Sequence, residues 1–333
     1  MKRAINLLAL LIFLNVLVFG QKIEFLKKEN QIDVMVNGNL FTTYCFGHHL
    51  SKPILYPVHS PSGEMVTRRY PFEIVEGESH DHPHHTGVFF TYGSRGEVNG
   101  NSYWANRHDR PPLTMDKKIP GIRQVKLLKM KGGNNQGKLI TLNHWVDSAD
   151  NPILEEKRTM DFYVSKDEYT IDFTILLKAL DSDVTFEDTK EGMFGIRVAE
   201  WMTENSTEYP QFSKGEYLNA EGQRTTENVW GRRSAWVRLE SEKDGKKIGI
   251  AIFHHPESVN YPTYWHARGY GCFTANPIGQ YQYQKETGVK NPQYRTYTLK
   301  KGESGLFKFR MLIYEGPRTK KDMDLEFEEF TKN

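Results

Sequence analysis

Residues 236–253 read WVRLESEKDGKKIGIAIF, and this stretch decides the predicted fold. Its two halves, 236–240 and 247–253, contain many strand-forming residues and flank the sequence KDGK at 243–246. An Asp-Gly pair between two such runs is typical of a tight turn that joins antiparallel strands. The stretch therefore predicts a β-hairpin.

The same kind of pattern recurs along the chain. Residues 33–44 place strand-forming residues on both sides of Asn37-Gly38, and residues 294–313 do so around the sequence KGE. In 169–175, Tyr, Ile, Phe and Ile alternate with Thr, Asp and Thr, which is the period of a strand with one buried face. Successive hairpins predict antiparallel sheets.

Antiparallel sheets with one apolar face bury that face by packing on each other. We therefore predict an all-β fold, a large antiparallel β-sandwich. No repeat or change in composition marks a boundary, so we expect a single domain over residues 21–333, with two packed half-sandwiches as the alternative. Residues 322–330 place Leu325, Phe327 and Phe330 among acidic residues with helical spacing, which predicts a short C-terminal helix.

The composition excludes some partners and favours others. Lys and Arg number 44 against 42 Asp and Glu, and a net charge of +2 is far from the concentrated positive charge that binds nucleic acid. Aromatic residues make up 13% of the chain, and 17 of them are Tyr. Rings with a polar group suit β-structure and surfaces that hold polar ligands.

The first twenty residues have the pattern of a targeting signal. Lys2 and Arg3 precede an apolar stretch at 4–19, and Gly20 follows it. This order predicts a signal peptide over residues 1–20. A membrane anchor is the alternative, but about 16 residues are fewer than the roughly 20 that span a bilayer. We expect a secreted or periplasmic protein with no stable membrane anchor after cleavage.

An oxidising compartment bears on the two cysteines of the chain. Cys45 and Cys272 either pair in a disulfide or remain as two buried thiols, since two cysteines do not form a disulfide framework.

Seven of the 12 histidines fall into two segments. The sequence HDHPHHTG at 80–87 holds four of them, and residues 254–266 hold His254, His255 and His266. Because Pro83 disfavours a central strand position, we expect a loop or strand start there, at the end of a sheet. Four imidazoles on one loop suit metal binding, proton transfer near neutral pH, or hydrogen bonding to a polyol. A purely structural role as backbone caps is the alternative.

A metal site needs a ligand from outside the first segment. Neighbouring histidines rarely all reach one ion, whereas zinc and related ions need three or four ligands. The candidate ligands are His82, His84 and His266, and the cofactor would be a divalent metal ion.

The sequence YWHARGYG at 264–271 combines aromatic faces with charged donors. Sugars fit such a surface, because their C–H faces pack on rings and their hydroxyls bond to His, Arg and Asn. The expected substrate-binding residues are Trp104, Arg197, Trp265, Arg268, Tyr270 and Asn276. For Trp265 and Tyr270, a place in the core is an equally good explanation.

An acidic turn at 187–191 leads into a predicted strand that ends near Arg197. Glu191 and Arg197 suit a catalytic carboxylate and a guanidinium that binds a carboxylate, or else a solvated loop and an ion pair.

Four segments together, 81–87, 98–104, 190–197 and 265–279, resemble the bacterial PmoA-like family of secreted proteins of unknown function. The resemblance spans about residues 54–314 and implies a polysaccharide-degrading context. The literal meaning of the name, a membrane-embedded methane monooxygenase subunit, is excluded because the chain has one short apolar segment.

The chain is also similar, at the level of the fold, to the large sandwich of galactose-mutarotase-like and aldose-epimerase-like proteins. That resemblance implies a His acid and a carboxylate base acting on a sugar held in a concave sheet. Candidate carboxylates are Glu191, Glu200 and Glu286, and Glu191 is the first to test.

The leading hypothesis is a carbohydrate-active enzyme of the hydrolase, lyase or epimerase type. It acts on a sugar, oligosaccharide or modified glycoside, with His84, His85, His266 and Glu191 transferring protons, because imidazoles titrate near neutral pH. The alternatives are a non-catalytic glycan-binding module and a metal-dependent enzyme. The hypothesis requires His84 and His266 to share one site.

Overall fold

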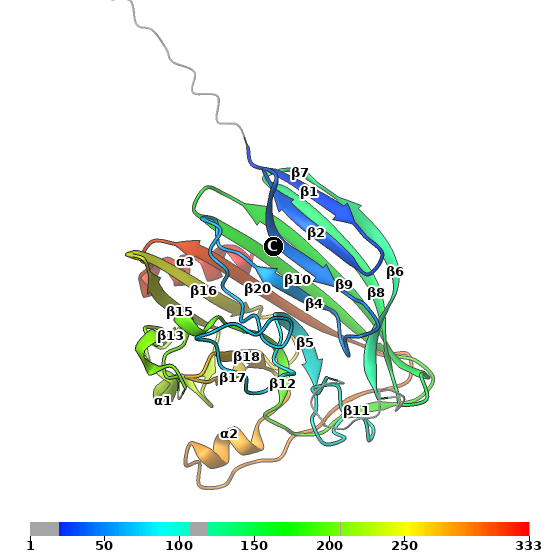
Figure 1. Cartoon of the computed structure of the whole chain (residues 1–333). Coiled ribbons are helices and arrows are strands. Elements are labelled where there is room, and N and C mark those ends of the chain that lie inside the picture. The colour runs from blue at the N-terminus through cyan, green and yellow to red at the C-terminus, as the bar shows by residue number, and fades with distance from the viewer. Residues whose placement is uncertain (1–19, 107–118, 207, 333) are drawn as a thin grey trace, which may run out of the picture.

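The computed structural model describes residues 20–106, 119–206 and 208–332. Residues 1–19, which carry all but the last residue of the expected signal peptide, lie outside this part of the chain. The described residues form two large antiparallel sheets and one small sheet (Figure 1).

The first large sheet has ten strands. In chain order they are β1 (Lys22–Lys27), β2 (Gln31–Val36), β3 (Asn39–Cys45), β4 (Ile54–Val58), β5 (Val88–Tyr92), β7 (Gly133–Asn134), β12 (Gly192–Arg197), β14 (Arg233–Ser234), β17 (Thr263–Ala267) and β18 (Cys272–Asn276). Their order across the sheet is β14-β17-β18-β12-β5-β4-β3-β2-β1-β7.

The second large sheet has eight strands. They are β6 (Gly121–Lys131), β8 (Gln136–Val146), β9 (Pro152–Val164), β10 (Glu168–Ala179), β13 (Glu216–Asn219), β15 (Trp236–Lys243), β16 (Lys246–His254) and β20 (Ser304–Glu315). Their order is β13-β15-β16-β20-β10-β9-β8-β6, and the small sheet pairs β11 (Val184–Phe186) with β19 (Tyr297–Leu299).

Helices are few and short. They are α1 (Thr226–Val229), α2 (Tyr281–Glu286) and α3 (Lys320–Phe330), with single 3-10 turns at Glu200–Met202 and Pro210–Phe212. Within the ranges that the structure describes, none of the helices has the length and apolar character needed to cross a bilayer.

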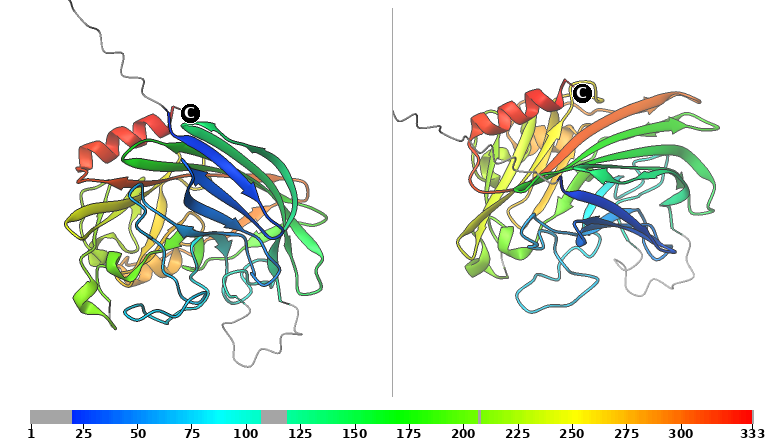
Figure 2. Two further views of the ribbon diagram at one scale, coloured as in Figure 1. Left: turned by 45° about the horizontal axis from the view of Figure 1, so that its top comes forward. Right: turned by 90° about the horizontal axis from the view of Figure 1, so that it is seen from above.

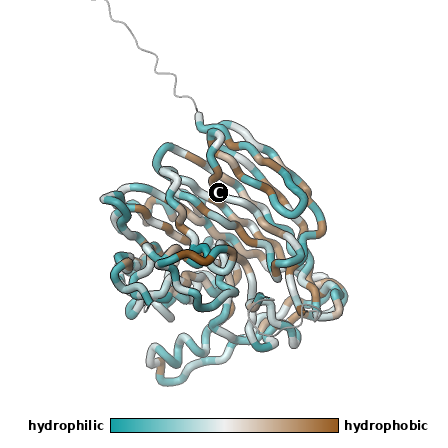
Figure 3. The backbone as a smooth tube through the Cα atoms, in the orientation of Figure 1, coloured by the Kyte–Doolittle hydropathy of each residue, from teal (hydrophilic) through white to brown (hydrophobic). Residues whose placement is uncertain are grey.

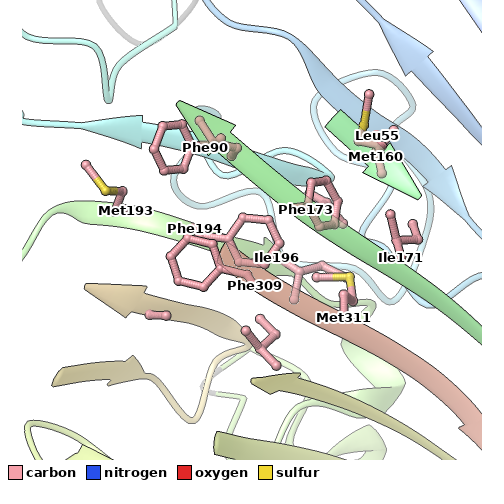
Figure 4. Packing of buried hydrophobic residues seen from close by; sticks show 14 of the residues in the cluster. Leu55, Phe90, Met160, Ile171, Phe173, Met193, Phe194, Ile196, Phe309 and Met311 are labelled. Carbon is pink, nitrogen blue, oxygen red and sulfur yellow. The ribbon is translucent and has the colours of Figure 1, made fainter. Parts of the chain in front are cut away.

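The two large sheets lie face to face and enclose the core (Figure 2). In β10, Ile171, Phe173 and Ile175 are buried between the sheets, while the residues between them point to the other face. The Phe194 ring lies 4.7 Å from Phe173 and 4.6 Å from Phe309, which joins β12 of one sheet to β10 and β20 of the other (Figure 4). Apolar segments lie mainly along the strands and hydrophilic ones in the loops (Figure 3). The predicted antiparallel β-sandwich is confirmed.

Two of the predicted hairpins are confirmed. β2 pairs with β3 around Asn37-Gly38, and β15 pairs with β16 around Asp244-Gly245. All four turn residues have positive φ angles between 51° and 83°, which Asn, Asp and Gly tolerate best.

The third predicted hairpin, around KGE at 301–303, is wrong. β19 before this turn pairs with β11, whereas β20 after it pairs with β10 and β16. β10 occupies one edge of β20, and β16 with the segment that follows it, through His255 and Val259, occupies the other, so no edge is left for β19.

The C-terminal helix is confirmed and covers the outer face of the eight-stranded sheet (Figure 2). Thr319 and Asp322 form a capping box at its start. Met323 and Phe330 pack against the sheet, but Leu325, which we expected on the apolar face, is 53% exposed.

The second histidine segment is divided by the fold. His254 is fully buried, 5.2 Å from the Phe309 ring, and His255 packs against Phe330 of α3. Burial lowers the pKa of His254 to about 3, and neither ring nitrogen has a hydrogen-bond partner among the described residues. His254 is therefore a neutral core residue. Cys45 and Cys272 are free thiols.

Two adjacent leucines of β10 provide a matched test of the sandwich. Leu177 is fully buried and Leu176 is 39% exposed on the opposite face. We expect Leu177→Ala to reduce the free energy of unfolding by about 2–5 kcal/mol, because it removes buried methyl groups and leaves a cavity. Leu176→Ala should cost less than about 1 kcal/mol. Guanidinium chloride unfolding measures both, and equal losses would contradict the assignment of the two faces.

His254 makes the fold sensitive to acid. The unfolded imidazole takes up a proton below about pH 6.5, whereas the folded one stays neutral down to about pH 3. The contribution of His254 to the free energy of unfolding is therefore fully present above pH 6.5 and is lost as the pH falls toward 3. Between pH 7 and pH 5 the loss is about 2 kcal/mol.

We expect His254→Phe, which keeps an aromatic ring, to reduce the pH dependence of the unfolding free energy by that amount in urea titrations. The exposed His49→Gln is the control and should leave the pH dependence unchanged. An unaltered pH dependence in His254→Phe would show that this imidazole titrates normally in the folded protein.

Candidate functional site

β5, β12, β18 and β17 are neighbours in the ten-stranded sheet (Figure 1). A cavity of about 510 Å³ is lined by His266 of β17 and by the loops next to β5, β12 and β17. It occupies the face that points away from the other sheet. Successive residues of a strand point to opposite faces. In β17, Trp265 and Ala267 belong to the core between the sheets, whereas His266 lines the cavity.

Four separate segments of the chain form the cavity walls. They are the loop before β5, the loop after β5, the turn before β12, and β17 with the turn that follows it. The lining residues are His82, His84, His85, Ser94, Trp104, Ala105, Lys190, Glu191, His266, Arg268 and Tyr270. All four predicted catalytic residues line this one cavity, so the structure brings His84 and His266 into one site.

Asp81 is the anchor of the histidine loop. Its carboxylate accepts hydrogen bonds from the buried guanidinium groups of Arg68 and Arg197, the latter at 2.7 Å. Burial raises the pKa of Asp81. The hydrogen bond from His82 and the charges of Arg197 and Arg68 together lower it by more than burial raises it, so the pKa lies well below its ordinary range. Asp81 is therefore ionised at neutral pH.

His82 is held by Asp81 and by two parallel rings. Its Nδ1 lies 2.6 Å from Asp81 Oδ2 and donates to it, since an ionised carboxylate only accepts. The His82 ring is parallel to those of His85 and Tyr270, at centroid distances of 4.9 and 5.3 Å. A positive φ of 40° turns the residue into this position. Its side chain is 45% exposed, which leaves Nε2 available to a ligand.

His85 and His266 form deeper parts of the wall. Burial, the largest cause, lowers the pKa of both well below 6.5, and the charges of Arg197 and Arg268 act in the same direction. Both imidazoles are therefore neutral at neutral pH. The expectation that each is available in both protonation states is wrong for these two residues. As neutral imidazoles they suit hydrogen bonding rather than the role of a charged acid.

Three charged side chains face the cavity. Lys190 forms an ion pair with Glu191. Arg268 lies 4.6 Å above the Trp230 ring, and its Nε donates to His266 Nε2 at 3.3 Å. Arg268 has no ion-pair partner among the described residues.

Aromatic faces close the site. The Trp104 ring lies 5.4 Å from His85 and 5.4 Å from Phe89, and both rings contact it edge-on. Tyr270 lies between His82 and the guanidinium of Arg197, 4.7 Å from the latter. Both rings were predicted to bind substrate and both line the cavity.

The predicted metal-binding set needs correction. No group of three or more His, Cys, Asp or Glu residues in the described ranges has a geometry that fits a metal ion. His266 Nε2 accepts from Arg268 Nε, and the positive charge of Arg268 opposes a cation there. His82, His84 and His266 share a cavity wall but do not form a coordination sphere.

Three predicted substrate-binding residues do not line the cavity. Trp265 is fully buried on the other face of β17, and its indole donates to the Ser234 carbonyl. The Asn276 amide donates to the Thr189 carbonyl and its oxygen accepts from Gly279, so it holds a turn. Arg197 is 1% exposed; its guanidinium donates to Asp81 and packs on the Tyr270 ring.

Several residues of the site were missed from the sequence. Lys190 and Ser94 line the cavity, and Asp81 orients His82. The adjacency of Asp81 and His82 was a visible signal for such a pair. The bond of Arg68 to Asp81 has no local signal in the sequence.

The comparisons with known proteins identify a family and several similar solved structures. No curated protein matches the sequence. Among solved structures, the chain is similar to the galactosidase domain of the alpha-galactosidase-sucrose kinase AgaSK, with 8% identity and a TM-score of 0.43, over 89% of this chain and 40% of that one. It is also similar to a galactose mutarotase-like protein from Clostridium acetobutylicum, with 9% identity and a TM-score of 0.39, over 90% of this chain and 99% of that one.

A third similar structure is the alpha-galactosidase AgaA from Geobacillus stearothermophilus, with 11% identity and a TM-score of 0.33, over 89% of this chain and 40% of that one. The chain thus spans about two fifths of the length of these two galactosidase chains. The PmoA-like resemblance stays a prediction, because the family that matches has a different name. The model of a family of unknown function, DUF6807, matches residues 31–328, and the chain belongs to this family.

Proposed function

We propose that this protein is an exported carbohydrate-active enzyme that transfers protons on a sugar bound in the cavity. The observation that carries the proposal is the gathering, from four chain segments, of an anchored His82, the neutral His85 and His266, and Glu191 in one cavity. The predicted signal peptide at 1–20 and the resemblance to a family from polysaccharide-degrading bacteria support export and a sugar substrate.

His82 is the proposed proton carrier. A carboxylate bonded to Nδ1 fixes the tautomer and orientation of an imidazole and stabilises its protonated form, so that Nε2 exchanges protons with a substrate. Asp81 supplies this carboxylate and is itself fixed by Arg68 and Arg197. This role replaces the metal-binding role predicted for His82.

Glu191 and the neutral His266 are the proposed partners in proton transfer. Hydrolysis, elimination and epimerisation of sugars all pair a group that accepts a proton with one that donates it. Glu191 is held beside Lys190, and His266 beside Arg268, so each has a cation that stabilises negative charge developing nearby. Trp104 and Tyr270 line the cavity and give it an apolar part that the C–H groups of a sugar can contact.

A non-catalytic glycan-binding module is the competing function. Trp104, Tyr270 and Arg268 would serve it equally well. The buried network that orients His82 favours the enzyme, because binding alone has no use for a carboxylate held by two buried arginines.

The first test is turnover. We expect the purified protein to convert at least one member of a panel of oligosaccharides and oxidised sugars, followed by NMR and mass spectrometry. His82→Gln should reduce the rate by about 100-fold or more, the range lost with a general acid or base. The exposed His48→Gln, which lies outside the cavity lining, is the matched control and should keep full activity.

The same variants separate the two functions. Retained sugar affinity in His82→Gln with lost turnover supports the enzyme. Sugar binding without turnover of any panel member by the wild-type protein supports the binding module. If the wild-type protein neither binds nor converts any sugar, the proposed function is wrong.

A further inference from the structure

We infer that the cavity selects sugars that carry a carboxylate, the uronates, and that Arg268 binds this group with help from Lys190. The inference rests on the proposed function that the cavity holds a sugar. It adds the chemical class of that sugar and the residue that recognises it.

Arg268 is built as a receptor for an anion. The face of its guanidinium packs on Trp230 at 4.6 Å, and Nε is used by His266 at 3.3 Å. None of the carboxylates in the described part of the chain lies within 4.0 Å of it. The other two nitrogens of the Arg268 guanidinium, Nη1 and Nη2, belong to a side chain that lines the cavity. A guanidinium fixed in this way loses little side-chain freedom when a ligand binds.

The contact with His266 leaves the positive charge of Arg268 without a counter-charge. Because the pKa of His266 lies well below 6.5, the imidazole is neutral and accepts from Arg268 without cancelling its charge. An acidic partner at the same place would have neutralised the guanidinium. The full positive charge of Arg268 is therefore directed at the cavity.

The charge of the surrounding wall also favours an anion. Among the described residues that line the cavity, the cations are Lys190 and Arg268 and the carboxylate is Glu191. The cations exceed the carboxylates by one. Arg197, 1% exposed, has two nitrogens without a hydrogen-bond partner among the described residues, so its charge is incompletely satisfied.

A single carboxylate matches this arrangement better than a phosphate does. Two nitrogens of a guanidinium lie in one plane and match the two oxygens of a carboxylate. Glu191 in the same cavity opposes the second negative charge of a phosphate monoester. A neutral sugar would leave Arg268 without an anion.

The test compares sugars that differ in one group. Isothermal titration calorimetry with galacturonate, galactose and galactose 6-sulfate, and with glucuronate against glucose, measures the preference of the wild-type protein. We expect at least one uronate to bind at least about tenfold more tightly than its neutral counterpart. Arg268→Gln should weaken the binding of that uronate by about 30-fold or more and so remove most of its preference over the neutral sugar.

Two further variants serve as controls for the Arg268→Gln experiment. Arg232→Gln removes the same charge from an exposed position near Trp230 and should change uronate affinity by less than about threefold. Arg268→Lys keeps the charge without the planar fork and should recover only part of the affinity. It also gives a reading if Arg268→Gln fails to fold, which circular dichroism would show.

The outcomes distinguish this inference from the function on which it rests. Equal affinity for uronate and neutral sugar would overturn the uronate assignment and leave the proposed function intact. Tighter binding of galactose 6-sulfate than of galacturonate would overturn the carboxylate and assign a sulfated sugar. Absence of binding to every sugar, with no turnover, would overturn the proposed function itself.

Discussion

Asp81 lies at the point where the candidate site is attached to the sheet. Its carboxylate joins Arg68, which precedes the histidine loop, to Arg197 at the end of β12, and it also holds the His82 ring. Two buried guanidinium groups close together repel each other, and burial lowers the pKa of Arg68 to about 10. The shared carboxylate makes this arrangement possible, because a buried charge without a counter-charge is strongly destabilising. The position of His82, its stacking on the rings of His85 and Tyr270, and the part of the cavity wall that these rings form all depend on the Asp81 carboxylate.

The alternation of β17 explains why residues next to each other have different roles. Trp265 and His266 are neighbours in the chain, yet one packs on Phe273 in the core and the other faces the cavity. Gly195 of β12 lies directly opposite Thr274 of β18, and a side chain at Gly195 would clash with it. Gly195 therefore allows β12 and β18 to pair closely on this face of the sheet.

Much of the fold was predictable, because its signals are local. The Asp-Gly and Asn-Gly turns and the alternation at 169–175 need only a few neighbouring residues to be read. The partner of β19 was not predictable, since it depends on which strand edges other segments occupy. For the site, the histidine segments and Glu191 were found from residue type alone. For Arg197 the structure has the ion pair that was one of the two alternatives, but its partner Asp81 could not be named because it lies 116 residues away in the sequence. For Trp265 the core position was one of two equal alternatives, because the sequence does not show which face of the sheet is the core.

The four-segment cavity has a consequence for folding. Its walls come from parts of the chain between residues 82 and 270, so they are together only when β17 and β18 are paired in the same sheet as β5 and β12. A partly folded chain that lacks this pairing has no complete cavity. A bound sugar therefore stabilises the native state alone. It is expected to lengthen the lifetime of the folded protein while leaving the rate of folding almost unchanged, because the transition state gains nothing from a ligand whose site is not yet assembled.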